Sequence, residues 1–131
     1  MERKHDPSRT SAGGHAGMHR ERDARQRLLA AGADDLSPPP WRPAPVPPSA
    51  VDLVQFAVWR SADLDPDDLL SALALMPAAR AEIEGVEAGL LFSARSAGLT
   101  WAQIADAMGF RSPQACQQHF GRLNAKRDDR P

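Results

Sequence analysis

The sequence has few of the features that mark membrane, secreted or disulfide-bonded proteins. Its 131 residues include one cysteine, Cys116, so an internal disulfide is impossible and there is no CxxC pair. No apolar stretch approaches the roughly 20 residues that a membrane-spanning helix needs. No apolar segment follows the basic start at Met1–Lys4 that a secretory leader would have. We therefore expect a cytoplasmic protein that does not enter a membrane.

The motifs of common catalytic sites are also absent. The sequence has no glycine-rich phosphate loop, no HExxH, no GxSxG and no His/Cys cluster with metal-ligand spacing. His15 and His19 are four residues apart, but they lie in a Gly- and Ala-rich segment without further ligands. We therefore expect no enzymatic activity, no catalytic residue, no metal site and no cofactor.

The amino-terminal part of the chain is poor in large apolar residues. Residues 1–37 are dominated by Arg, Asp, Gly, Ser and Ala, and such a segment cannot bury enough surface to offset its conformational entropy. We expect disorder there, except over Glu21–Ala31, which has good helix formers and two leucines. Residues 37–48, SPPPWRPAPVPP, predict an extended spacer, because repeated proline favours left-handed geometry. The alternative is a ligand for a proline-recognising domain, with Trp41 as anchor.

From residue 50 onward the pattern predicts helices. Val51–Trp59 is mixed in period and fits either a short helix or an irregular packing arm. Asp65 and Pro66 suit the N-cap and the first position of a helix, and the acids that follow suit the positive end of its dipole. Pro77 ends this helix or begins the next one. The predicted buried side of the helix consists of Leu69, Leu70, Leu73 and Met76.

A long helix is predicted over residues 78–97, with one apolar stripe covering the helices that follow. Gly85 and Gly89 each cost roughly 1 kcal/mol relative to alanine inside a helix. They therefore predict that another helix approaches closely, either the Val51–Trp59 segment or a second copy of the chain in a homodimer. The stripe consists of Ala79, Ile83, Val86, Leu90, Ala94 and Ala97.

Two short helices joined by a tight turn are predicted within Gly98–Phe120. Thr100 suits the N-cap of the first helix. Gly109 can adopt the left-handed conformation that ends a helix, and Ser112 with Pro113 restarts the chain as N-cap and first helical residue. This pattern is typical of a helix-turn-helix. The buried face of its first helix, at i, i+3, i+4 and i+7, consists of Trp101, Ile104, Ala105 and Met108.

The second of these helices has one apolar face and one polar, uncharged face. Cys116, Phe120 and Leu123 stand at i, i+4 and i+7 and are expected to face the core. An outward-facing, oxidisable Cys116 is the alternative. The opposite face is predicted to read DNA bases, because glutamine offers an acceptor and a donor together to adenine. The predicted base-contacting residues are Gln114, Gln117 and Gln118.

The charge pattern around this helix suits a polyanion. No acidic residue lies between Phe110 and Arg127, whereas residues 50–97 carry eight acidic and three basic residues, a net charge of −5. Cationic and hydroxyl side chains near a recognition helix typically contact the DNA backbone and fix its register. The predicted phosphate-contacting residues are Thr100, Arg111, Ser112, Arg122, Lys126 and Arg127.

The two motifs GLTWAQIADAMGF and SPQACQQHF carry a family resemblance. Together, residues 98–123 resemble the helix-turn-helix of sigma-factor region 4 and of related actinobacterial DNA-binding proteins. The resemblance covers about a fifth of the chain and implies a role in transcriptional regulation. Helix-turn-helix units also serve as protein-docking modules, so the resemblance does not decide the partner.

These observations predict a small all-α protein. We expect a disordered arm and Pro-rich linker at residues 1–49, a helical DNA-binding domain at residues 50–127 with its helix-turn-helix at 100–126, and a tail at 128–131. The predicted function is that of a sequence-specific transcriptional regulator that binds double-stranded DNA. The alternative is a protein-interaction module that docks to RNA polymerase, a sigma factor or another regulator through the acidic helices and the proline-rich segment.

Overall fold

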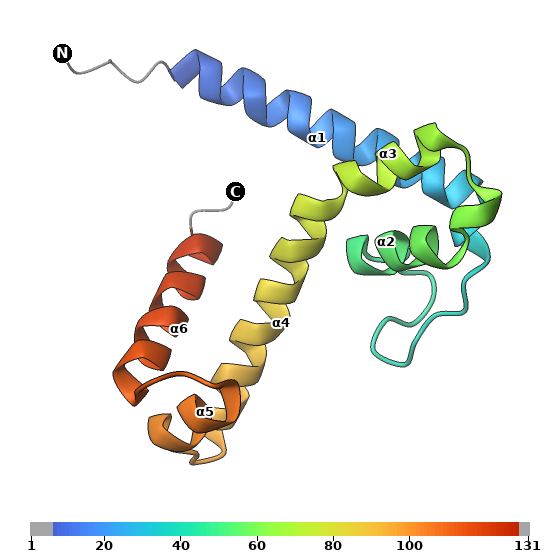
Figure 1. Cartoon of the computed structure of the whole chain (residues 1–131). Coiled ribbons are helices and arrows are strands. Elements are labelled where there is room, and N and C mark those ends of the chain that lie inside the picture. Colours follow the sequence, from blue (N-terminus) through green and yellow to red (C-terminus); the bar gives the residue numbers. More distant parts are fainter. Residues whose placement is uncertain (1–6, 129–131) are drawn as a thin grey trace. The chain divides into compact units, whose positions relative to one another are not determined.

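A computed structural model describes the backbone of residues 7–128 and the side chains of residues 14–126. In this range the regular secondary-structure elements are all helices, which confirms the all-α class expected from the sequence (Figure 1). None of these helices is long and apolar enough to cross a membrane. The α-helices are α1 (Pro7–Ala30), α2 (Ala50–Trp59), α3 (Pro66–Ala74), α4 (Met76–Ser96), α5 (Trp101–Met108) and α6 (Pro113–Asp128), with 3-10 helices η1 (Ala33–Asp35) and η2 (Ser61–Asp63).

The chain divides into two compact units, residues 1–80 and residues 81–131. This division differs from the boundary between residues 49 and 50 that the sequence predicts. Helix α4 contributes residues 76–80 to the first unit and its remainder to the second. Pro77 lies in the first turn of α4, so this proline begins a helix rather than ending α3.

The first unit is built from α1, α2 and α3, with α1 in contact with both other helices. Ala24 and Leu28, one helical turn apart, are both buried, and they lie in Glu21–Ala31, the part of the amino-terminal segment that the sequence excepted from disorder as a good helix former. The composition of the whole segment hides the short apolar stripe formed by these two residues. The stripe is buried because α1 packs against α3. Residues 1–6 lie outside the described part. The core consists of Ala24, Leu28, Ala33, Leu53, Phe56, Ala57, Ala72 and Leu75.

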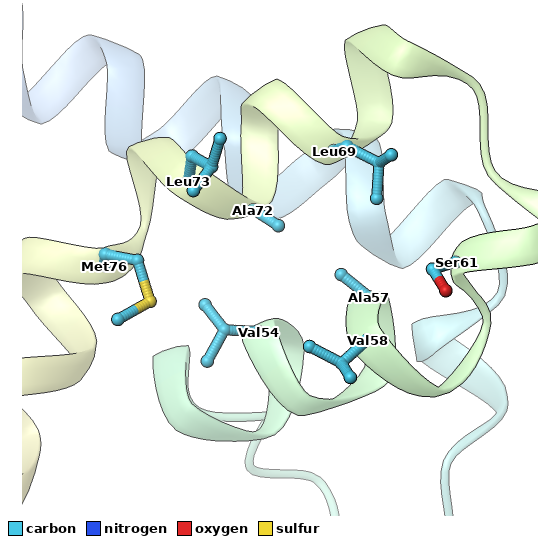
Figure 2. A pocket seen from close by; sticks show the side chains of 8 residues that line it. All are labelled: Val54, Ala57, Val58, Ser61, Leu69, Ala72, Leu73 and Met76. Atoms are coloured by element: carbon cyan, nitrogen blue, oxygen red, sulfur yellow. The ribbon is translucent and has the colours of Figure 1, made fainter.

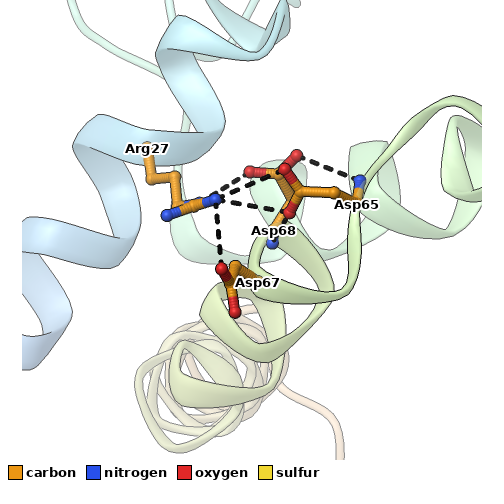
Figure 3. Close-up of polar contacts among 4 residues, drawn as sticks. All are labelled: Arg27, Asp65, Asp67 and Asp68. Carbon is orange, nitrogen blue, oxygen red and sulfur yellow. Dashed lines mark hydrogen bonds and ion pairs between the residues drawn. The ribbon is translucent and has the colours of Figure 1, made fainter.

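Arg27 connects α1 to the first turn of α3 (Figure 3). Its Nε donates to Oδ1 of Asp68 at 2.7 Å, and its Nη2 lies 3.3 Å from Asp65 and 3.9 Å from Asp67. The hydrogen bond to Asp68 is the main reason why the pKa of Arg27 is raised. The pKa of Asp65 is lowered, chiefly because the backbone N–H of Asp68 donates to its carboxylate and also because Arg27 is close. These acids therefore cap α3, as the sequence predicts, and also tie it to α1.

The proline-rich segment at residues 37–48 is a folded loop, and the extended spacer expected from its composition is wrong. Two backbone hydrogen bonds of the i to i+3 type bend it. The guanidinium of Arg42 donates to the carbonyl of Val46 at 3.0 Å and forms an ion pair with Asp52 of α2, also at 3.0 Å. This tertiary contact overrides the preference of proline for extended chain. Trp41 is 86 % exposed at the surface of the loop.

The Val51–Trp59 segment is a regular helix, capped by the Ser49 side chain, rather than an irregular arm. In α3 the expected buried side is wrong, because Leu70 and Leu73 are 62 % and 64 % exposed. The small Ala57 of α2 and Ala72 of α3 are buried instead, and the larger side chains stand beside them around a groove (Figure 2). This groove of about 340 Å³ is lined by Val54, Ala57, Val58, Ser61, Leu69, Ala72, Leu73 and Met76.

Candidate nucleic-acid interface

The second unit consists of the carboxyl-terminal part of α4 together with α5 and α6 (Figure 1). Its core is made of small and medium side chains from all three helices, with four partly buried residues around them. Such a core lets the helix axes approach closely. The buried residues are Ala88, Leu91, Ile104, Ala105, Cys116 and Leu123, and the residues around them are Ala94, Trp101, Phe110 and Phe120.

The face of α4 that covers α5 and α6 differs from the predicted stripe. Ala88 and Leu91 form it, and Ala94 of the predicted stripe packs beside them. Three other members of the predicted stripe, Ile83, Val86 and Leu90, are 54 %, 56 % and 66 % exposed. Because α4 carries apolar residues around most of its circumference, periodicity alone does not single out the buried face.

Gly85 and Gly89 have open space beside them in the described part of the chain. A Cβ atom built at either position meets nothing within 4 Å among the described residues. The close neighbour that these glycines predict, either the Val51–Trp59 segment or a second copy of the chain, stays a prediction.

The helix caps and the turn of the helix-turn-helix are formed by the residues that the sequence predicts. The Thr100 side chain accepts a hydrogen bond from the N–H of Gln103, whose side chain accepts one from the Thr100 N–H in return. Gly109 ends α5 with a left-handed φ of 78°. The hydroxyl of Ser112 accepts from the N–H of Ala115 at 3.1 Å and so caps α6. These caps satisfy amide groups that a helix start would otherwise leave without partners.

The packing of α5 departs from the prediction at one position and adds one contact that the sequence did not reveal. Ile104 and Ala105 are buried as expected, but Met108 is 39 % exposed. The ring of Trp101 lies 5.6 Å from that of Phe120 in α6. Arg95 of α4 places its guanidinium carbon 5.0 Å from the Trp101 ring centre, which is a cation–π contact. It also donates to the carbonyl of Leu99, which holds the α4–α5 turn.

Helix α6 has the two faces that the sequence predicts. Cys116 and Leu123 are fully or almost fully buried, and Phe120 packs beside them. The three glutamines on the opposite side are all exposed, so the structure brings them together on one surface. These residues are Gln114, Gln117 and Gln118.

The predicted phosphate contacts have different surroundings. Arg111 and Arg122 are exposed beside the glutamine face, and Thr100 and Ser112 serve as helix caps. Nζ of Lys126 lies 3.4 Å from Glu84 of α4, so part of its charge is already balanced. The side chain of Arg127 lies outside the described residues.

His119 and Glu87 form a contact that no sequence motif revealed. Nε2 of His119 lies 2.7 Å from Oε1 of Glu87, and both side chains are less than one-third exposed. The imidazole also contacts the ring of Phe110, with the ring centres 5.2 Å apart. His119 is thus a packed residue at the edge of the apolar face of α6.

Cys116 is buried and chemically protected. Burial raises the pKa of its thiol, and the nearby Glu87 carboxylate raises this pKa further. A thiol with a raised pKa stays protonated at neutral pH, whereas the thiolate is the reactive form. The outward-facing, oxidisable Cys116 considered from the sequence is therefore wrong.

Residues 87–131 match the family of Myb-like DNA-binding domains. No curated protein and no solved structure is similar to the chain. The match begins in the second half of α4 and continues through α5 and α6, so it concerns about a third of the chain and lies within the second unit. It supports a DNA-binding domain of the helix-turn-helix type at this position. The closer resemblance to sigma-factor region 4 stays a prediction.

Proposed function

We propose that the second unit binds double-stranded DNA in a sequence-specific manner, with α6 as the recognition helix, and that the protein regulates transcription. The observation that carries this proposal is the exposed row of Gln114, Gln117 and Gln118 on the side of α6 opposite the buried Cys116 and Leu123. The match of residues 87–131 to Myb-like DNA-binding domains supports the same partner.

The chemistry of the glutamine row suits base recognition in the major groove. A glutamine amide can accept from N6 and donate to N7 of adenine at the same time, and each such pair gives about 1–3 kcal/mol of discrimination between bases. Because the row is uncharged, it can approach the base edges without a competing ion pair.

The electrostatic contribution to DNA binding is expected to be local. Residues 81–126 contain four basic and four acidic residues, so this stretch has no net charge. The basic side chains nearest the glutamine row are Arg111 and Arg122. Lys126 has to leave its ion pair with Glu84 before it can contact a phosphate. The Ser112 hydroxyl accepts a hydrogen bond as a helix cap and can still donate one to a phosphate oxygen. We therefore expect modest non-specific affinity, with Arg127 and Thr100 as further backbone contacts.

A binding-site selection on the full chain tests this function. The protein is incubated with a pool of random double-stranded oligonucleotides, and bound DNA is recovered and sequenced over several rounds. We expect an enriched motif that contains adenines, with an affinity for it that exceeds the affinity for a scrambled site at each of two salt concentrations. A pool that stays random after selection contradicts the proposal.

A second candidate function is protein binding by the first unit, and the groove between α2 and α3 favours it. The groove is lined almost entirely by apolar side chains, and Leu73 at its edge is 64 % exposed (Figure 2). The candidate partners are RNA polymerase, a sigma factor or another regulator. Binding of the purified chain to purified RNA polymerase, with A72D as the variant that blocks the groove, tests this candidate. Equal binding of wild-type protein and A72D to the polymerase excludes the groove as the binding site.

A further inference from the structure

We propose that Glu87 is a positioning residue for DNA recognition: by holding His119, it fixes the rotation of α6 about its axis and so determines which glutamines face the bases. This inference rests on the proposed function of the second unit. It assigns a role in base recognition to Glu87 of α4 and His119 of α6, although neither residue is proposed to contact a base.

The core alone does not fix this rotation completely. The buried residues that α4 and α5 place against α6 are Ala88, Leu91, Ile104 and Ala105, and two of these four are alanines. Apolar burial is non-directional, so this packing leaves room for a small turn of the helix about its axis. A hydrogen bond is directional in both distance and angle, and it therefore restricts rotation far more strongly.

The contact between His119 and Glu87 has the geometry that this role requires. The 2.7 Å separation is short, as expected for a bond to a carboxylate, and the two side chains are only 27 % and 29 % exposed. Phe110, in the turn before α6, lies against the same imidazole at 5.2 Å. His119 therefore links α4, the α5–α6 turn and α6 at a single point. Its neighbour in sequence is Gln118, one of the three predicted base contacts.

The ion pair between Glu84 and Lys126 also joins α4 to α6, but it restricts the rotation of α6 less than the contact of Glu87 with His119. Glu84 pairs with Lys126, and Glu87 pairs with His119, so the two helices run in opposite directions. Along α4 the two acids are separated by about 4.5 Å, whereas along α6 their partners are separated by about 10.5 Å. The long Lys126 side chain has to span this difference, which fits its 3.4 Å separation from Glu84 and its 63 % exposure. Exposed pairs of this kind restrict geometry weakly.

The test compares Glu87→Ala and Glu87→Gln with wild-type protein on the motif obtained by binding-site selection. The measured quantity is the ratio of affinity for that motif to affinity for a scrambled site. We expect E87A to lower this ratio about tenfold, equivalent to the loss of one bidentate base contact. We expect E87Q to retain the ratio within about twofold, because its amide oxygen can still accept from Nε2–H. E84Q is the matched control, and it is expected to retain the ratio although it also removes one charge from α4.

A spectroscopic measurement on the free protein separates positioning from simple stability. In a ¹H–¹⁵N spectrum of the imidazoles, His119 is identified by the loss of its signals in His119→Phe. We expect the Nε2-protonated tautomer in wild-type protein and in E87Q, and a mixture of tautomers in E87A. If E87A does not fold, H119F carries the same expectation for the affinity ratio, because it keeps the ring contact with Phe110 but cannot donate a hydrogen bond.

The possible outcomes distinguish this inference from the proposed function. If the wild-type chain enriches no motif, the proposed function fails. If it enriches a motif and E87A and H119F bind with an unchanged ratio, the positioning role is overturned while the function stands. An E84Q variant that loses as much discrimination as E87A also overturns the inference, because the effect is then one of charge and not of the bond to His119.

Discussion

Nε of Arg27 in α1 donates a 2.7 Å hydrogen bond to Asp68 in α3, 41 residues further along the chain. This contact makes the amino-terminal helix part of the first unit. We expect Arg27→Ala to lower the melting temperature and to accelerate amide hydrogen exchange in residues 24–30. Arg25→Ala is the control, because among the described residues Arg25 pairs with Glu21, four residues earlier in the same helix. Equal effects of the two variants contradict a specific role of the contact to α3.

The stability of the first unit is expected to fall in acid. The folded pKa of Asp65 is lowered, first by the backbone N–H of Asp68 and also by Arg27. An acid with a lowered folded pKa contributes stability that is fully present above its unfolded pKa of about 3.9 and is lost as the pH falls through the folded value. Thermal unfolding of wild-type protein and Asp65→Asn between pH 2 and pH 6 measures this effect.

The difference in melting temperature between these two proteins is expected to be largest at the upper end of the range and to shrink below about pH 4. Asparagine remains a good N-cap, so the comparison isolates the carboxylate charge. A difference that does not change with pH contradicts the prediction.

Replacing glycine by alanine is expected to stabilise the protein at two positions in α4 and to destabilise it at the end of α5. At Gly85 and Gly89 a Cβ atom meets nothing within 4 Å, so each substitution should raise the free energy of unfolding by about 0.5–1 kcal/mol. At Gly109, with its φ of 78°, alanine should lower it by about 1–2 kcal/mol. Chemical denaturation measures all three. If Gly85→Ala or Gly89→Ala destabilises the protein, a close neighbour such as a second copy of the chain occupies this face.

The glutamine row and the arginines are expected to affect DNA binding differently. Gln114→Ala and Gln117→Ala should each relax the preference at one base pair by about 1–3 kcal/mol and leave the salt dependence unchanged. Arg122→Ala should weaken binding to every sequence and reduce the slope of log affinity against log salt by about 1. Gel shifts with selected and scrambled sites at several salt concentrations separate the two effects. A loss of sequence preference in R122A and none in Q114A or Q117A contradicts the assignment of roles.

Cys116 is expected to be unreactive in the native protein. Its side chain is completely buried, and the pKa of its thiol is raised by burial and by Glu87. We expect a thiol reagent at pH 7.5 to label it slowly, at a rate set by unfolding, and to label it rapidly in denaturant. Oxidation with dilute peroxide should leave DNA affinity unchanged. Rapid labelling of the native protein contradicts this prediction.

Local features of the helix-turn-helix could be predicted from the sequence alone. Thr100, Gly109 and Ser112 were each assigned the cap or turn role that the structure has. The exposed glutamines and the buried Cys116 followed from the spacing within α6. These features depend on atoms within four residues of one another, so their physics is contained in a short stretch of chain.

The choice of buried face and the polar contacts between helices were decided only by the tertiary structure. Leu73 and Leu90 are exposed while Ala72 and Ala88 are buried, because small residues let helices approach and a helix that is apolar on several sides has no single preferred face. The contact of Glu87 with His119 joins residues 32 positions apart, and no local pattern records it. Sequence therefore determined where the helices begin, end and turn, whereas the arrangement of whole helices determined which of their sides are buried, because burial depends on a partner surface elsewhere in the chain.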